Sequence, residues 1–141
     1  MAGPLSHIKV LDLSRVLAGP WSTQMLGDMG AEVIKIERPG HGDDTRKWGP
    51  PFSKNVDGTD GDAAYFHCAN RNKTSRTVDI TTRDGQETIK QLAMECDIIV
   101  ENYKVGGLKK YNLDYDSLNA LNSGLIYCSI TGFGQNGPHA N

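Results

Sequence analysis

Short apolar runs alternate along the chain with segments whose apolar residues recur at helical spacing. The runs are rich in β-branched residues and have the length of strands; they cover residues 8–13, 32–37, 76–80, 97–102 and 125–130. Several are apolar throughout, which is typical of parallel strands that are covered on both faces. The pattern therefore predicts a parallel sheet with helices packed against it.

The segment after the first predicted strand has the features of a helix. Pro20 suits the first helical turn, where its missing N–H is not needed, and Gly30 suits the stop. An apolar stripe at helical spacing consists of Trp21, Met25, Leu26 and Met29. The sequence predicts one helix here, between the first two strands.

Two further helices are predicted later in the chain. Thr82 can cap the longer one, whose apolar positions at helical spacing are Ile89, Leu92, Ala93 and Cys96. The shorter one runs from Asp116 to Asn122, with Leu118 and Leu121 facing inward. Because strands alternate with helices, we expect an α/β fold with a doubly wound, mostly parallel sheet.

Two segments depart from this alternation. Residues 39–62 are rich in Gly, Pro and Asp and are expected to form a long loop; loops of this length in a compact domain usually have a function. Residues 132–141 contain glycines and a proline but no helical pattern. Since a doubly wound sheet normally continues beyond its fifth strand, we expect residues 1–141 to be the incomplete, N-terminal part of a larger domain.

Composition narrows the function classes. The chain has 141 residues, enough for one domain with a core. Its formal charge of -2 argues against a general nucleic-acid or membrane-surface binder, which should be basic. No apolar run approaches the roughly 20 residues of a membrane helix, and the N-terminus resembles no targeting signal. Cys68, Cys96 and Cys128 form no CxxC pair and are interpreted as reduced thiols. We therefore expect a cytoplasmic protein with neither nucleic-acid nor membrane partners.

Basic residues gather where predicted strands end. Arg15, Arg38 and Lys104 follow the first, second and fourth strands; Arg71, Lys73, Lys109 and Lys110 lie near other strand ends. The glycine patterns of dinucleotide-binding folds and of P-loops are absent. Because ligands of open α/β sheets bind outside the carboxyl ends of the strands, these cations predict a site for a polyanionic small molecule. For any single one of them, a solvated surface charge is the simpler interpretation.

No complete catalytic or metal-binding set is recognisable. Asp43 and Asp44 follow His41 but match no calcium loop; a solvated turn or a partner for Arg46 is the simpler interpretation. The histidines lack zinc spacing, and no serine or cysteine stands in a nucleophile motif. Cys128, inside an apolar strand, is expected in the core.

Taken together, the motifs resemble one enzyme family. The stretch "VLDLSRVLAGPWSTQMLGDMGAEVIKIERPGHGDDTR", and after it "NRNKTSRTVDI", "CDIIVENYKVGGLKKYNLDYDSLNALN" and "LIYCSITGFGQNGP", resemble the class III CoA-transferases of the CaiB/BaiF type, which include formyl-CoA transferase. The likeness runs from Leu5 to Pro138 in an unbroken order of motifs. Such an extended match is more specific than any single short pattern.

The resemblance implies a Rossmann-like domain that binds coenzyme A (CoA) along the carboxyl edge of its sheet, as a substrate and not as a permanent cofactor. It puts Leu17 and Ala18 beside the thiol arm and Arg38 against the nucleotide phosphates. Adenosine is expected near Val78, Asp79, Ile80 and Thr81, and the same cleft is expected to include Arg15, Asn102, Tyr103, Lys104 and Lys110. Arg and Lys side chains can pair with the phosphate charges of CoA. One departure is Lys104, where the family usually has an arginine, because lysine lacks the bidentate fork.

The resemblance also implies a reaction. Family members move CoA between an acyl-CoA and a carboxylic acid through an aspartyl mixed anhydride and an aspartyl-CoA thioester, and they form interlocked homodimers. The catalytic aspartate lies downstream of the matched segment, beyond Asn141, so we expect no catalytic residue in this chain and no transfer by the chain alone. Two alternatives remain. One is a fragment of an α-methylacyl-CoA racemase-like enzyme, which the GHGDDTR loop and the VEN motif disfavour, and the other is a CoA-binding module without chemistry.

Overall fold

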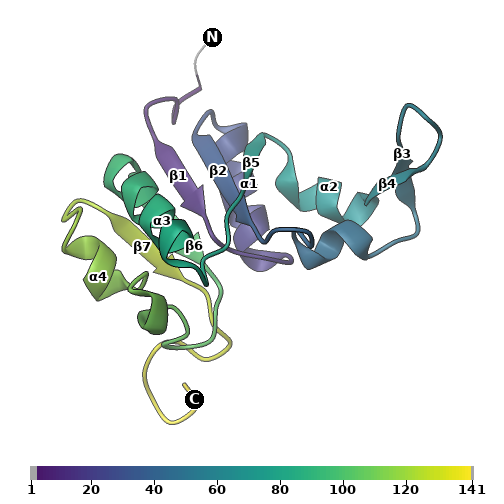
Figure 1. Cartoon of the computed structure of the whole chain (residues 1–141). Coiled ribbons are helices and arrows are strands. Elements are labelled where there is room, and N and C mark those ends of the chain that lie inside the picture. Colours follow the sequence, from purple (N-terminus) through teal and green to yellow (C-terminus); the bar gives the residue numbers. More distant parts are fainter. Residues whose placement is uncertain (1–2, 141) are drawn as a thin grey trace.

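The fold is built on a parallel sheet of five strands (Figure 1). The computed structural model describes residues 3–140. The strands of this sheet are β1 (Lys9–Asp12), β2 (Glu32–Glu37), β5 (Lys73–Thr77), β6 (Ile98–Glu101) and β7 (Ile126–Ser129). They are all parallel and lie in the order β5-β2-β1-β6-β7. The strand order therefore reverses between β1 and β6, which is the switch point of a doubly wound sheet. The predicted fold class is confirmed.

Two hydrophobic clusters cover the two faces of the sheet. Alternate residues of β1 face opposite sides: Val10 packs in the cluster that includes Leu26 of α1 (Ala18–Asp28), and Leu11 packs in the other. That second cluster includes Ile89 of α3 (Arg83–Glu95) and Leu118 of α4 (Tyr115–Asn119). Helix α1 thus covers one face, and α3 and α4 cover the other (Figure 1).

Helix α3 follows the sequence prediction closely. The hydroxyl of Thr82 accepts a hydrogen bond from the Gly85 N–H at 3.1 Å, which caps the helix. The predicted inward positions Ile89, Ala93 and Cys96 are buried, and Leu92 packs beside them. The longest periodic segment was therefore the most predictable one.

Helix α1 forms where predicted but presents a different face to the sheet. Trp21 and Met25 of the apolar stripe are more than half exposed, and Met29 is 40% exposed. The buried positions are instead small or polar: Gly19, Pro20, Thr23, Gln24 and Gly27. The helix lies so close to the chain after α2 (Ala64–Asn70) that a Cβ on Gly27 would be 3.0 Å from the Asn72 carbonyl oxygen. Close approach and polar contacts, rather than an apolar stripe, therefore orient this helix.

Three smaller predictions were wrong. Strand β5 begins three residues before the predicted segment and ends at Thr77, because it pairs with β2 through its polar residues; Val78 and Ile80 pack against the core from the following turn. Helix α4 ends at Asn119, which leaves Leu121 47% exposed. Cys128 is exposed, since β7 is an edge strand with an open face.

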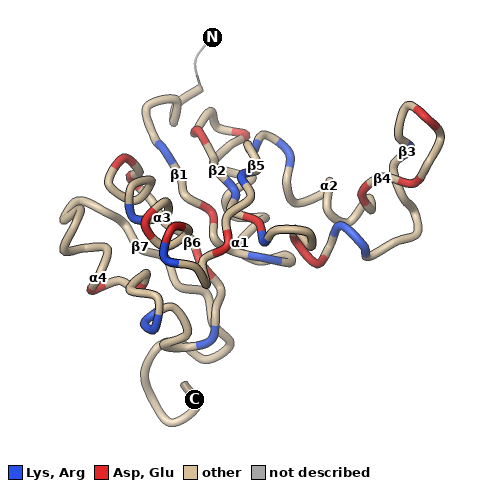
Figure 2. Tube along the Cα trace, viewed as in Figure 1, with Lys and Arg blue, Asp and Glu red and all other residues tan. Residues whose placement is uncertain are grey.

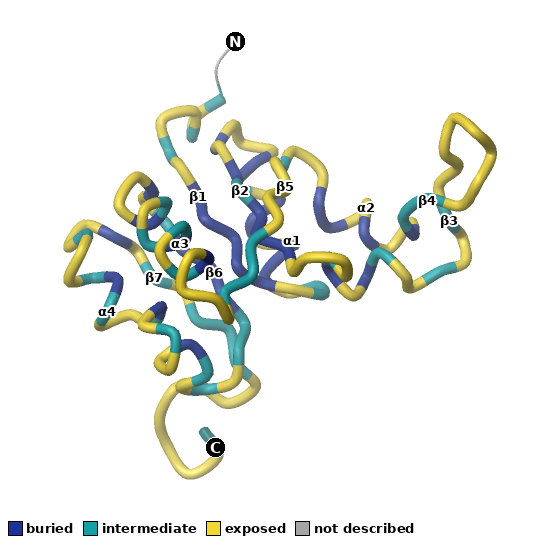
Figure 3. The backbone as a smooth tube through the Cα atoms, in the orientation of Figure 1, coloured by how far each residue is buried: buried dark blue, intermediate teal, exposed yellow. Residues whose placement is uncertain are grey.

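The expected loop over residues 39–62 contains regular structure. A 3₁₀ turn, η1 (Asp44–Lys47), is followed by a hairpin of β3 (Phe52–Lys54) and β4 (Asp60–Ala63), and α2 comes directly after it. The hairpin projects away from the sheet, and its tip is exposed (Figures 1 and 3). A second 3₁₀ turn, η2 (Lys109–Tyr111), follows β6 and contains the basic pair Lys109 and Lys110, which was predicted to lie near the strand ends. None of the described helices is long and apolar enough to cross a membrane.

Candidate functional site

A cleft of about 580 Å³ opens at the carboxyl ends of β1, β2, β5 and β6. It includes every predicted ligand-contacting residue except Leu17 and Ala18, namely Arg15, Arg38, Val78, Asp79, Ile80, Thr81, Asn102, Tyr103, Lys104 and Lys110. Their side chains come from four separate connections after strands, which explains why they meet at one edge. The structure thus brings the predicted residues together, and their ligand contacts remain a prediction.

The cleft has a local surplus of positive charge. Within residues 3–140, Arg38, Lys104 and Lys110 take part in no ion pair, and all of them are exposed. Asp79 lies on the same wall, but its carboxylate accepts hydrogen bonds from the N–H and hydroxyl of Thr81, which lower its pKa. Elsewhere acidic and basic residues are interleaved along the chain (Figure 2). The surplus of cations therefore belongs to the cleft and suits an anionic ligand.

Apolar and aromatic groups complete the walls. Val78 and Ile80 line the cleft while they pack against the core. Tyr103 is half-buried, and its burial raises the pKa of its phenol. The Arg15 guanidinium lies 5.8 Å from the centroid of the Tyr103 ring, within cation–π range. The cleft can therefore accept a ligand that carries both phosphate groups and flat or apolar parts.

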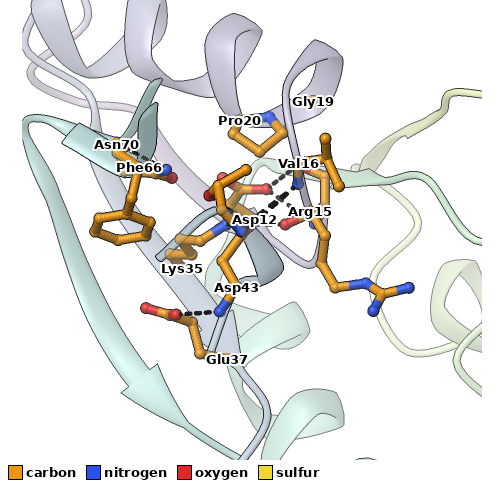
Figure 4. A network of polar contacts seen from close by, with 12 residues as sticks. Asp12, Arg15, Val16, Gly19, Pro20, Lys35, Glu37, Asp43, Phe66 and Asn70 are labelled. Atoms are coloured by element: carbon orange, nitrogen blue, oxygen red, sulfur yellow. Dashed lines mark hydrogen bonds and ion pairs between the residues drawn. The ribbon is translucent and has the colours of Figure 1, made fainter. Parts of the chain in front are cut away.

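The inner wall of the cleft contains a cluster of buried charges (Figure 4). Lys35 Nζ is 2.9 Å from Asp43 Oδ2, and both side chains are almost inaccessible to solvent. Burial alone would raise the pKa of Asp43, but the adjacent Lys35 ammonium holds it below its ordinary value. The interpretation of Asp43 as a solvated residue or as a partner of Arg46 was wrong. Asp44 is the exposed one, and it pairs with Arg15 at 3.3 Å.

Glu37 anchors η1 to the end of β2. Its carboxylate accepts hydrogen bonds from the Asp43 N–H at 2.7 Å, from Arg46 Nε at 2.7 Å and from the Ser75 hydroxyl at 2.6 Å. Burial would raise the pKa of Glu37, but these donors outweigh it and lower the pKa to about 2. Arg46 also binds Asp62, and its guanidinium carbon lies 3.7 Å from the centroid of the Phe66 ring. These contacts fix the start of the hairpin segment beside the cleft.

Three of the cations noted near strand ends lie outside the cleft, and one of them, Lys109, lines a neighbouring cavity. The side chain of Lys73 is almost inaccessible to solvent, and its ammonium lies 2.9 Å from Asp12 Oδ2; burial lowers its pKa despite this partner. Arg71 pairs with Asp28 at 2.5 Å on the surface. These residues are therefore not part of the cleft lining, and the prediction that they join its cations was wrong.

Leu17 and Ala18 stand at the start of α1, next to the cleft but not in its lining. Leu17 is the residue before the first helical turn and makes no side-chain cap. The preceding Val16 has a left-handed backbone with φ of 71°, which is uncommon for a β-branched residue. The loop that connects β1 to α1 is therefore held in a specific conformation.

Some cleft residues were not found from the sequence. The lining also includes Lys35, Ile36, Glu37, Gly42, Asp43, Gly107 and Tyr111. Lys35 lies in the middle of the apolar strand β2, where a charged side chain is buried and requires a partner. This position was the feature of the sequence from which its burial beside a partner could have been predicted. A second cavity of about 820 Å³ shares Asn102, Tyr103 and Lys104 with the cleft and continues toward Phe133. Among the described residues, no cluster of His, Cys, Asp or Glu could hold a metal ion.

Comparison with known proteins gives a consistent result. The sequence model of CoA-transferase family III matches residues 5–141. The chain is 56% identical over 138 residues to succinate–glutarate CoA-transferase of Agrobacterium fabrum, which covers 98% of this chain and 34% of that protein. It is 53% identical over 135 residues to succinyl-CoA:glutarate CoA-transferase of Homo sapiens, at 96% and 30% coverage. The chain thus spans about a third of the length of these curated relatives.

A solved structure resembles the whole of this fold. The crystal structure of a CaiB/BaiF family protein from Brucella suis superimposes with a TM-score of 0.93 at 56% sequence identity. The match covers 99% of this chain and 36% of that one. The sheet and its helices are therefore shared with that protein over essentially the entire chain.

Proposed function

This chain belongs to CoA-transferase family III, and on that premise we propose that its cleft binds CoA or an acyl-CoA. The observation that carries the proposal is the set of exposed cations, Arg38, Lys104 and Lys110, around a cleft that also has apolar walls. CoA carries several phosphate charges at its nucleotide end and a long, largely uncharged arm that ends in the thiol. The mixed lining of the cleft matches that combination.

We assign the two ends of the ligand to different parts of the cleft. The nucleotide end, with its phosphates, would lie at Arg38 and along Val78–Thr81. The uncharged arm would then pass Arg15 and Tyr103 toward the loop between β1 and α1. This order places the phosphates at the exposed cations and the arm at the half-buried aromatic wall.

The reaction itself is proposed for the larger protein of which such a cleft is a part. An aspartate outside the matched segment would attack the thioester carbonyl, releasing the CoA thiolate and forming a mixed anhydride. The thiolate would then attack the aspartyl carbonyl, release the first carboxylate and leave an aspartyl-CoA thioester. The acceptor carboxylate would displace the thiolate from this thioester, and the thiolate would attack the acyl carbonyl of the second mixed anhydride, which frees the aspartate and completes the transfer. Because CoA leaves and returns within one turnover, a site that keeps its nucleotide end bound keeps the thiolate at high effective concentration. We propose that this chain supplies that site.

The relatives suggest a substrate class. Both named relatives act on succinate or succinyl-CoA and glutarate, so we propose short dicarboxylic acids as donor and acceptor. The second cavity continues from Asn102 and Tyr103 toward Phe133, and we propose that it receives the acyl group. We also propose a homo-oligomer for the larger protein. A racemase-like enzyme or a CoA-binding module without chemistry would use the same cleft.

Calorimetric titration of the 141-residue chain with CoA tests the binding site. We expect saturable binding that weakens at least tenfold in Arg38→Gln. Lys54→Gln is the matched control, because Lys54 is equally charged and exposed but lies on the hairpin, where it pairs with Asp60. Absence of binding by the wild-type chain, or equal losses in both variants, would contradict the proposal. Assaying the same chain with succinyl-CoA and glutarate tests whether binding and transfer are separate, since we expect this chain to bind CoA but not to transfer it.

A further inference from the structure

Side chains from two other elements hold the loop that follows β1. In the Ser14–Val16 loop, the Ser14 carbonyl accepts a hydrogen bond from Lys35 Nζ at 3.0 Å. At the other end, the Val16 N–H donates to the Asp43 carboxylate at 3.2 Å. Between them, Arg15 is the residue that enters the lining of the cleft. The loop is therefore one wall of the cleft, and its backbone is tied to the end of β2.

Asn102 holds the same loop from the opposite side. The Arg15 N–H donates to Asn102 Oδ1 at 2.9 Å, and Asn102 Nδ2 donates to the Arg15 carbonyl at 2.7 Å. One amide side chain thus satisfies both backbone groups of Arg15, in the way that a neighbouring strand would. Since both polar atoms of its side chain are engaged with the loop, Asn102 is better suited to orient the cleft wall than to contact a ligand directly.

The conformation held in this way is not one that the loop would favour alone. Val16 is β-branched and has φ of 71°, a region that such residues rarely adopt. Its N–H is fixed by Asp43, a buried carboxylate whose own position is set by Lys35 and by hydrogen bonds from Thr45. The Arg15 side chain points away from this cluster (Figure 4). The buried charges therefore determine where Arg15 and the start of α1 stand relative to the cleft.

We propose that Asn102 and Asp43 are positioning residues, which hold the Ser14–Val16 loop in the conformation that receives the uncharged arm of CoA. This inference rests on the proposed function and adds that different residues are responsible for binding the two ends of CoA. The nucleotide end of the ligand depends on Arg38 and the Val78–Thr81 turn, whereas the arm depends on a loop that these two side chains hold. Loss of either side chain therefore weakens binding of the arm and leaves binding of the nucleotide end unchanged.

Two ligands separate this role from a general structural one. The probes are CoA and adenosine 3′,5′-bisphosphate, which contains the nucleotide end without the arm. In Asn102→Ala we expect affinity for CoA to fall about tenfold and affinity for adenosine 3′,5′-bisphosphate to change less than twofold. Asn55→Ala is the control, because its amide makes comparable local hydrogen bonds on the distant hairpin. Equal loss for both ligands in Asn102→Ala, or no loss for either, overturns the proposal.

Backbone hydrogen exchange supplies a readout that needs no ligand. We expect the Arg15 amide to exchange at least tenfold faster in Asn102→Ala, and the Val16 amide to do so in Asp43→Ala. Asn102→Asp retains the acceptor for the Arg15 N–H but loses the donor, so it should keep the Arg15 protection while losing part of the CoA affinity. Unchanged exchange in Asn102→Ala overturns the proposal even if Asp43→Ala fails to fold. A wild-type chain that binds neither ligand refutes the proposed function, and faster exchange would then support the holding role alone.

Discussion

Lys35 and Asp43 form a buried ion pair at the inner wall of the cleft, with Nζ and Oδ2 2.9 Å apart. Lys35 lines the cleft, but its ammonium is occupied by Asp43 and by the Ser14 carbonyl. It is therefore unavailable for a ligand phosphate. The cations that remain for an anionic ligand are the exposed ones at the rim, above all Arg38 and Lys104.

The buried pair should be costly to break from one side. Lys35→Met leaves the Asp43 carboxylate buried without its counter-ion, and we expect the free energy of unfolding to fall by about 3 kcal/mol. Chemical denaturation with urea measures this loss. In the double variant Lys35→Met/Asp43→Asn the carboxylate charge is also gone, so the loss should be smaller than in Lys35→Met. A double variant that is less stable than Lys35→Met would contradict this account.

Glu37 should make stability depend on acid pH. Its pKa is lowered to about 2 in the folded protein, whereas an unfolded glutamate titrates near 4.3. The stabilisation is therefore present above about pH 4.3 and is lost as the pH falls from there toward 2. Urea denaturation at pH 7, 5, 4 and 3 measures the fall. Glu37→Gln should be less stable at pH 7 and should show a shallower fall, and parallel curves for the two proteins would argue against this assignment.

Lys104 offers a gain-of-affinity test. An arginine at this position would add a planar, bidentate donor for phosphate, so we expect Lys104→Arg to bind CoA about threefold more tightly and Lys104→Gln to bind it more weakly. Raising the salt concentration should weaken binding in each case. Titration calorimetry at two salt concentrations gives both results. Equal affinity in all three proteins would exclude Lys104 from the site.

The orientation of α1 can be tested by stability. Trp21 is more than half exposed, so Trp21→Ala should cost less than about 0.5 kcal/mol. Thr23 is fully buried and donates to Asp12 Oδ2 at 2.6 Å, so Thr23→Val should cost about 1 to 2 kcal/mol. Thermal or urea unfolding distinguishes the two. A larger loss of stability for Trp21→Ala than for Thr23→Val would mean that the apolar stripe of α1, and not the face with Thr23, packs in the interior.

The sequence predicted best where local pattern and packing agree. Strand β2 and helix α3 could be located because their apolar positions have one dominant spacing. The face of α1 could not, because Gly19, Thr23 and Gly27 are buried for reasons of close approach and polar contact, which hydrophobicity does not encode. Strand β5 was misplaced because an edge strand can pair through polar residues, while Val78 and Ile80 fill the core from a turn.

The candidate site shows the same division. The positions of the exposed cations Arg38 and Lys104 could be predicted because both residues directly follow strands, where a charged side chain normally points into solvent. The partners of Asp43 could not, since they depend on how residues far apart in the chain meet: Lys35 comes from a strand, and Val16 from the loop after another. Only the tertiary structure shows that an aspartate in a Gly-rich stretch is buried.

The most direct test of the central claim is a titration of the isotopically labelled chain with CoA, followed by backbone amide NMR shifts. We predict saturable shifts at Arg15, Arg38, Val78–Thr81 and Tyr103, with the β3–β4 hairpin unchanged. Shifts confined to other surfaces, or no shifts with CoA in large excess, would contradict the assignment of this cleft as the CoA site.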